Sequence, residues 1–152
     1  MTLSVSGQRS SSVHVDAVDT TRDGDLGLPK DPGRVGWWQG GALAGETYGS
    51  VVLAGHIDSR AYGVGFFARL LQARPGDEVT LSDGRLEQRY AVVSNRNVNK
   101  QALATGTDTF SQSVPGRLVL ITCTGHFNTA TRHYEDNLVV LARPVGPVTG
   151  AR

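Results

Sequence analysis

Short runs in which apolar and polar residues alternate recur along the chain, and glycine, proline or aspartate separates one run from the next. A period of two is typical of β-strands with one buried face. The alternating runs are residues 3–5, 13–18, 78–81 and 86–93. Asp83-Gly84 lies between the last two runs and is a hairpin signal, so we expect these two strands to pair with each other.

Two further runs are apolar at every position, which predicts strands buried on both faces. Residues 51–54 lead into Gly55-His56, and residues 118–121 lead into Thr122-Cys123, which contains the only cysteine of the chain. A side chain at the end of a buried strand is held rigidly, yet it lies at the rim of the sheet where a substrate can reach it. Both runs therefore present a reactive side chain at a strand end.

Helical patterns are few and short. Residues 63–71 and 99–103 each predict a short helix, and the apolar segment 137–142 predicts the closing strand. With 19 glycines and 6 prolines in 152 residues, the chain fits one all-β domain rich in turns. We place this domain at residues 1–143 and expect residues 144–152 to form a mobile tail.

The charge balance narrows the classes of partner. Fifteen basic and 14 acidic residues give a formal net charge of +1, which argues against a nucleic-acid or membrane-surface partner recruited by bulk charge. No apolar run approaches the ~20 residues that cross a bilayer, and no signal-peptide apolar segment occurs. A single cysteine excludes an internal disulfide framework. No Cys/His metal spacing or phosphate-binding glycine loop occurs, so we expect no metal and no cofactor.

The candidate chemistry depends on Cys123 and His56. A thiol reacts as its thiolate, and an imidazole within reach can take the thiol proton or protonate a leaving amine. Each residue also has a structural alternative, since lone cysteines and histidines are often ordinary packing residues. Asp58 could orient the imidazole or could instead open the next turn. The hydroxyl groups or backbone amides of Thr122 and Thr124 could help to hold an oxyanion.

Six segments, taken in order, resemble the sortase family, specifically the class E/F-like sortases of Gram-positive actinobacteria. They are residues 31–38 (DPGRVGWW), 52–59 (VLAGHIDS), 66–70 (FFARL), 75–77 (PGD), 120–125 (LITCTG) and 134–140 (YEDNLVV). Each segment is short, but together their order and placement are specific and cover most of the chain. The resemblance implies an eight-stranded sortase-type β-barrel with a few short helices.

The resemblance also implies a cysteine transpeptidase. Sortases cleave a Leu-Pro-x-Thr-Gly (LPxTG) type of sorting signal between Thr and Gly, hold the protein as a thioacyl-enzyme and pass it to an amine of a cell-wall precursor or pilin. Cys123 matches the nucleophile and His56 the general acid/base. Thr122 matches the residue before the cysteine that is associated with substrate and oxyanion, and we add Thr124 and Asp58 as substrate-binding candidates. The family implies an extracytoplasmic, cell-surface location, with an N-terminal membrane anchor absent from this chain.

One departure from the family pattern concerns the arginine that sortases place at the start of the strand after the cysteine loop. Here Asn137 stands at the corresponding position, and no arginine lies between Arg132 and Arg143. Arg143 follows the closing strand, which would put it about 20 Å away at the far end of an antiparallel neighbour. We favour Asn137 in the position, as a weaker neutral hydrogen-bond donor, and keep Arg132 in the loop as the alternative.

Two other functions fit parts of the pattern. Cys/His cell-wall peptidases of the papain-like or amidase type place the cysteine before the histidine, which is the reverse of the order here. The second is a degenerate sortase-like module that binds sorting signals without cleaving them. The missing arginine keeps this alternative open. Affinity for a sorting peptide without a thioacyl adduct would distinguish this module from an enzyme.

Overall fold

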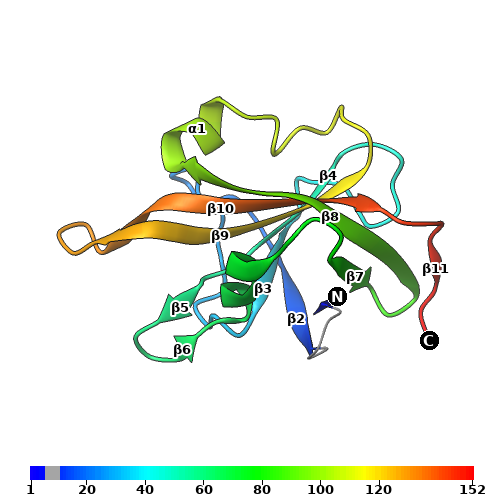
Figure 1. The fold of residues 1–152 in the computed structure, drawn as a ribbon, viewed down its shortest axis with the longest axis horizontal. Helices are drawn as coiled ribbons and strands as arrows, with labels where there is room; N and C mark the ends of the chain where they lie inside the picture. Colours follow the sequence, from blue (N-terminus) through cyan, green and yellow to red (C-terminus); the bar gives the residue numbers. More distant parts are fainter. Residues whose placement is uncertain (6–10) are drawn as a thin grey trace.

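The computed structural model describes residues 1–5 and 11–152, and most regular structure in them is β-strand (Figure 1). The strands are β1 (Thr2–Val5), β2 (Ser11–Val18), β3 (Val35–Trp38), β4 (Ser50–Ala54), β5 (Asp58–Ser59), β6 (Gly63–Val64), β7 (Glu78–Ser82), β8 (Leu86–Asn99), β9 (Arg117–Asn128), β10 (His133–Pro144) and β11 (Thr149–Gly150). The described helices are the 3₁₀-helix η1 (Phe66–Gln72) and the α-helix α1 (Lys100–Thr105).

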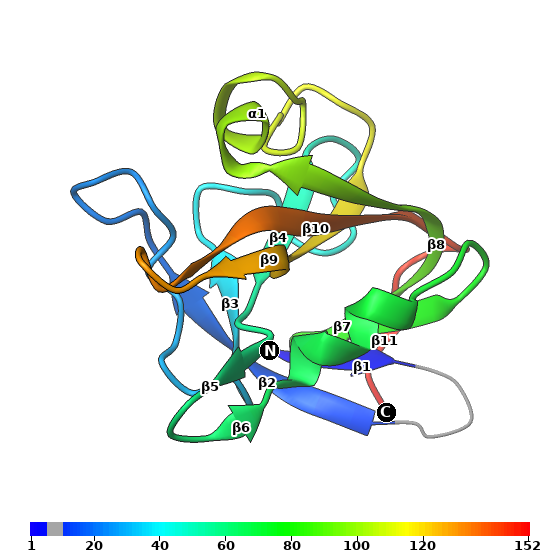
Figure 2. The same ribbon diagram turned by 60° about the vertical axis from the view of Figure 1, so that its left-hand side comes forward.

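Eight strands close into a barrel in the order β10-β9-β4-β3-β2-β1-β7-β8, because β8 also pairs with β10. β8 is long enough to pair with two strands: its first part pairs with β7, and its second part pairs with β10. In Figure 2, β9 and β10 cross the molecule on the side opposite β1 and β2. The predicted all-β barrel with a few short helices is confirmed.

The side chains of β4 and β9 alternate between two apolar clusters, one on each face of the sheet. Every barrel strand contributes to the larger cluster, which fills the interior and includes Leu53 and Leu120. The smaller cluster lies on the outer face and includes Ala54 and Ile121. Since both faces are covered, these strands can be apolar at every position, as their sequences are.

β4 and β9 run parallel to each other, with Val51 opposite Leu118 and Ala54 opposite Ile121. Parallel neighbours end at the same edge of a sheet. The residues that follow Ala54 therefore lie beside the residues that follow Ile121. This pairing is the feature of the fold that positions the site described below.

The two predicted helices form with adjusted boundaries. The first begins later than predicted, at Phe66, because Gly63–Val64 pairs with β5 as the short strand β6. Gly65 allows the close approach at its start, since a Cβ there would lie 2.5 Å from the carbonyl oxygen of His56. The second helix is α1, and the side chain of Asn99 caps it by accepting a hydrogen bond from the Ala102 N–H at 2.7 Å.

Strands continue where the sequence predicted loops. β8 extends beyond residue 93 to Asn99 because β10 pairs with its second part. Instead of forming an open loop over residues 124–134, β9 and β10 continue as a hairpin. The aromatic rings of Phe127 and Tyr134 face each other across it, 5.2 Å apart in an edge-to-face arrangement. Cross-strand aromatic pairs stabilise hairpins, which accounts for the extension.

The segment predicted as a tail contributes to the sheet. β10 ends at Pro144, one residue past the boundary that we placed at 143. β11 then adds to the edge of β8, with Thr149 opposite Glu87 and Gly150 opposite Leu86. These pairings lie far from the β9–β10 hairpin, at the other end of the molecule in Figure 1.

Candidate active site

The thiol of Cys123 lies on β9, one position beyond the buried apolar part of the strand. By strand alternation its side chain shares the outer face with Ile121, and it is half-buried. Directly opposite on β10 is Asn137, its Cα partner in the antiparallel ladder. Opposite residues in such a pair have their Cβ atoms about 5 Å apart on the same face. The carboxamide of Asn137 is therefore a close neighbour of the thiol.

The imidazole of His56 reaches the same place from β4. Since Ala54 is level with Ile121 in the parallel ladder, His56, two residues further on, is level with Cys123. Two hydrogen bonds extend this register past the end of β4: Gly55 N–H donates to the Ile121 carbonyl at 3.1 Å, and the Thr122 hydroxyl donates to the Gly55 carbonyl at 2.8 Å. Neighbouring strands lie about 4.8 Å apart, so this register puts the backbone of His56 beside that of Cys123.

Burial holds both reactive groups in their uncharged forms. It lowers the pKa of His56, against the opposing negative charge of Asp58. Burial also raises the pKa of Cys123; the positive charge of Lys100 opposes this rise, and Asp58 adds to it. At neutral pH the two groups are therefore a protonated thiol and a neutral imidazole. Such an imidazole can accept the thiol proton at the moment the sulfur attacks a carbonyl.

Asp58 begins β5 and is hydrogen-bonded to the β9–β10 hairpin. The hydroxyl of Tyr134 donates a hydrogen bond to Asp58 Oδ2 at 3.1 Å. Burial raises the pKa of Tyr134, and the bond to Asp58 adds to that rise. The negative charge of Asp58 thus acts on His56, Cys123 and Tyr134 together.

Arg132 lies at the tip of the β9–β10 hairpin, away from the thiol. Its backbone has a φ of 57°, in the left-handed region, and its N–H donates to the Asn128 carbonyl at 2.7 Å. Asn128 is five residues beyond Cys123 along β9, which corresponds to roughly 15 Å. The structure thus brings together Cys123, His56 and Asn137 but does not bring Arg132 to them.

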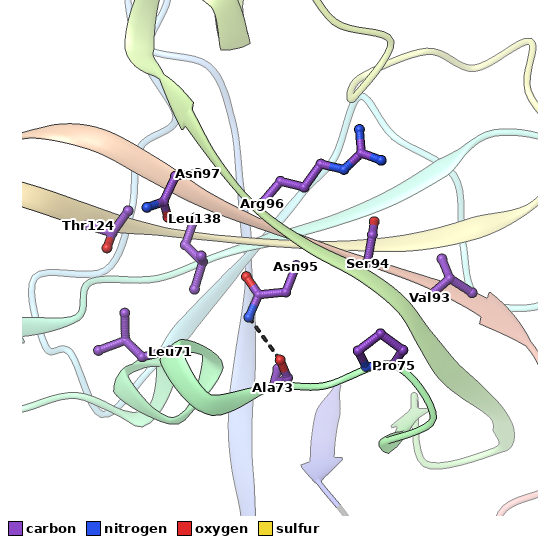
Figure 3. A pocket seen from close by; sticks show the side chains of 10 residues that line it. All are labelled: Leu71, Ala73, Pro75, Val93, Ser94, Asn95, Arg96, Asn97, Thr124 and Leu138. Carbon is purple, nitrogen blue, oxygen red and sulfur yellow. Dashed lines mark hydrogen bonds between the residues drawn. The ribbon is translucent and has the colours of Figure 1, made fainter.

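The two threonines that flank the cysteine both point to the opposite face of β9. Thr122 is buried, and its hydroxyl is engaged with Gly55, so it positions the strand ends instead of facing the thiol. Thr124 is also buried and lines a groove of about 690 Å³ between β8 and η1, together with Leu138 and Asn97 (Figure 3). Only their backbone amides remain near the thiol.

Sequence reasoning missed Lys100 and Tyr134. Lys100 begins α1, whose predicted position gave no indication that its charge would act on the thiol. Tyr134 was read as part of a loop, and its contact joins residues 76 positions apart. Neither residue has a spacing signal in the sequence, because both interactions depend on how distant strands pair.

The described residues contain neither a cluster of metal-ligand side chains nor a membrane-spanning helix. Across residues 1–5 and 11–152, no three or more His, Cys, Asp or Glu side chains gather as metal ligands would. Within the same residues, neither helix has the length and apolar character needed to cross a membrane.

The family model for the sortase domain matches residues 10–145, so this chain belongs to the sortase family. Its family and its fold indicate an enzyme of the sortase type, a transpeptidase. A search of curated protein sequences finds no match.

Solved sortase structures share the fold over most of the chain. Sortase A of Listeria monocytogenes aligns with 99% of this chain and 89% of its own, with a TM-score of 0.70 and 16% identity. Sortase E1 of Streptomyces coelicolor, solved with a tripeptide in the active site, aligns with 92% of this chain and 83% of its own, at a TM-score of 0.66 and 18% identity. Sortase C-1 of Actinomyces oris is 28% identical and covers 74% of this chain and 57% of its own, with a TM-score of 0.58.

Proposed function

We propose that this sortase-family protein is a cysteine transpeptidase that cleaves an LPxTG-type sorting signal between Thr and Gly. It releases the fragment that begins with Gly and transfers the protein that now ends in Thr to an amine. The observation that carries the proposal is the parallel register of β4 and β9, which sets His56 level with Cys123. The hydrogen bonds through Gly55 fix that register at the strand ends. Thiol and imidazole are the two groups that amide cleavage through an acyl-enzyme requires.

In the first half-reaction the sulfur of Cys123 attacks the Thr carbonyl of the signal, and His56 takes the thiol proton. The resulting tetrahedral intermediate collapses when the imidazolium returns this proton to the Gly nitrogen, which leaves as a free amine. A thioester to Cys123 remains. In the second half-reaction an acceptor amine attacks the thioester, a new amide forms, and the amine proton returns through His56 to the departing sulfur.

The tetrahedral intermediate carries a negative oxygen that needs hydrogen-bond donors. Asn137, opposite Cys123 in the ladder, supplies a neutral side-chain donor in our assignment, and the backbone amide of Thr124 supplies a second. Asp58 carries the charge that favours the imidazolium form of His56. Arg132 is the alternative donor, and it reaches the oxygen only if the hairpin folds over the thiol.

The wider setting follows from the resemblance to class E/F-like sortases of Gram-positive actinobacteria. Sortase E1 of Streptomyces coelicolor has this fold, as sortases A and C also do. We infer that the donors are proteins with LPxTG-type sorting signals and that the acceptor is an amine of a cell-wall precursor or a pilin. Sortase C of Streptococcus pneumoniae, described in terms of pilin substrate specificity, is among the structures with this fold. Such an enzyme works outside the cytoplasm at the cell surface, held by a membrane anchor in the full-length protein.

The decisive experiment is cleavage of a quenched fluorescent LPxTG peptide by the wild type and by Cys123→Ala, with and without hydroxylamine or triglycine. We expect cleavage by the wild type alone, stimulated by either amine, and a thioester adduct on Cys123 in the mass spectrum. Circular dichroism of Cys123→Ala provides the folding control. Cysteine-dependent cleavage that no amine stimulates would contradict transpeptidation and favour a Cys/His peptidase.

A second function, binding without cleavage, is favoured by one observation. The residue opposite the thiol is Asn137, where the sortase pattern has an arginine, so the site lacks a charged oxyanion donor on β10. Under this alternative, a panel of LPxTG-related peptides binds to folded wild-type protein but forms no adduct with Cys123.

A further inference from the structure

The helix α1 covers the face of the sheet from which the thiol projects. Ile121 of β9 belongs to the outer apolar cluster, and Val139 of β10 and Leu103 of α1 pack against that cluster. By strand alternation Cys123 lies on the same face as Ile121. In Figure 2, α1 lies over β9 and β10 on the side opposite β1 and β2. Helix and thiol therefore share the outer face.

The ladders place the start of α1 near the reactive end of β9. Asn99, the last residue of β8, is opposite Asp136, and Asp136 is opposite Thr124. Neighbouring strands lie about 4.8 Å apart, so at this level the end of β8 is roughly 10 Å from β9. Lys100 follows Asn99 directly and begins α1, which contacts β10. Since α1 lies over the outer face, β10 is beneath the helix and does not screen Lys100 from the thiol.

The side chain of Lys100 is directed toward this face by its position on the helix. Lys100 and Leu103 are three residues apart, so their side chains lie on the same side of α1. Leu103 packs on the outer cluster of the sheet. Lys100 is exposed, and its ammonium group sits at the end of a flexible four-carbon stem. α1 thus presents a hydrated positive charge over the outer face.

This charge acts on the thiol. Burial raises the pKa of Cys123, the positive charge of Lys100 opposes the rise, and the negative charge of Asp58 adds to it. The other titratable groups on the neighbouring segments are His56, which burial keeps neutral, and Tyr134, which donates its hydroxyl to Asp58. Of these groups, Lys100 is the one whose positive charge favours the thiolate.

We propose that Lys100 supplies the positive charge of the candidate active site, favouring the thiolate of Cys123 and the negative oxygen of the tetrahedral intermediate. The sortase pattern has an arginine on β10, where this chain has the neutral Asn137 opposite the thiol. Asn137 donates a hydrogen bond, while Lys100 acts through space from α1. The effect on the intermediate rests on the proposed transpeptidase function, and the effect on the thiol does not.

The first test is alkylation of the thiol by iodoacetamide, which needs no substrate peptide. Lys100→Gln removes the charge and keeps a long side chain that suits a helix, so the midpoint of alkylation moves to higher pH. Below the midpoint we expect alkylation about fivefold slower than in the wild type, as for partly screened charges roughly 10 Å apart. Lys100→Arg keeps the charge and the wild-type midpoint. Circular dichroism of both variants is the folding control.

A second cation on a strand next to β10 provides the matched control. Arg96 of β8 is opposite Val139, which is opposite Ile121, so it lies two residues from the level of Cys123. Its guanidinium group points away from Thr124 (Figure 3). Arg96→Gln therefore changes the net charge as Lys100→Gln does, and we expect the wild-type midpoint. In about 1 M NaCl the difference between the wild type and Lys100→Gln shrinks, because an exposed charge at this distance is screened.

Turnover tests the effect on the intermediate. With the quenched LPxTG peptide, Lys100→Gln lowers kcat and kcat/KM by the same factor, and Lys100→Arg restores both. Wild-type alkylation by Lys100→Gln would overturn the proposal, as would a loss that arginine does not restore or an equal shift in Arg96→Gln. An alkylation shift with wild-type turnover would overturn the part that concerns the intermediate. If no variant and no wild type cleaves the peptide, the proposed function fails, and alkylation still decides whether Lys100 acts on the thiol.

Discussion

At the scale of single residues, the protonation of the site depends on the balance between burial and nearby charges. Burial favours the neutral forms of both His56 and Cys123. Asp58 acts differently on the two, since its negative charge favours the imidazolium and disfavours the thiolate. Tyr134 holds Asp58 by a hydrogen bond that partly offsets this charge. Burial and Asp58 therefore set the protonation of the reactive pair, together with the positive charge of Lys100 at the thiol.

This balance predicts the pH dependence of thiol reactivity. Because the folded pKa of Cys123 is raised, the midpoint of its alkylation by iodoacetamide lies at a higher pH than that of an exposed thiol. Asp58→Asn removes a charge that disfavours the thiolate, so the midpoint moves to lower pH. Tyr134→Phe keeps the negative charge of Asp58 but removes the hydroxyl that donates to it, so the alkylation midpoint moves to higher pH. A shift of both variants in the same direction would mean that the variants act by loosening the site.

The oxyanion donor gives a second prediction at this scale. If Asn137 donates to the intermediate, Asn137→Ala lowers kcat/KM for the LPxTG peptide about a hundredfold, as loss of one such donor does. Arg132→Ala, at the hairpin tip, stays close to the wild type. Both rates are measured with the quenched peptide, with Arg132→Lys as the charge-retaining control. The reverse ranking would show that the hairpin arginine reaches the oxyanion and that our register for the family arginine is wrong.

At the scale of elements, the site depends on how the ends of β4 and β9 are joined. β4 ends at Ala54, and the ladder beyond it is continued by the hydrogen bonds of Gly55 with Ile121 and Thr122. A Cβ on Gly55 would lie 3.2 Å from the ring of Phe67, so glycine lets η1 pack closely against this junction. The position of His56 is thus determined by a buried junction directly before it.

Removing the hydroxyl at this junction tests its role. Thr122→Val keeps the shape of the side chain but leaves the Gly55 carbonyl without this partner, so we expect about 1–3 kcal/mol of lost stability in urea unfolding. Turnover of the LPxTG peptide also falls, because His56 is no longer held level with Cys123. Thr122→Ser keeps the hydroxyl and should retain most of both. Wild-type turnover by Thr122→Val would show that the junction does not position the imidazole.

At the scale of the whole molecule, the sequence predicted what depends on local pattern. The apolar runs before His56 and Cys123 became the central strands β4 and β9, and the alternating runs became barrel walls. The local pattern of apolar and polar residues could not show that β8 pairs first with β7 and then with β10. Which strands pair depends on how the whole sheet closes. For the same reason the contact of Tyr134 with Asp58 and the placement of Lys100 were not predictable.

The parallel pairing of β4 with β9 also has a consequence for how the chain folds. The bond between Thr122 and Gly55 joins residues 67 positions apart, and no short turn can bring parallel neighbours together. Closing so long a loop costs entropy before any contact repays it, so non-local pairings of this kind form slowly. Until β9 docks beside β4, the chain carries an isolated thiol and a distant imidazole. Completion of the barrel and the appearance of a reactive site are therefore one event.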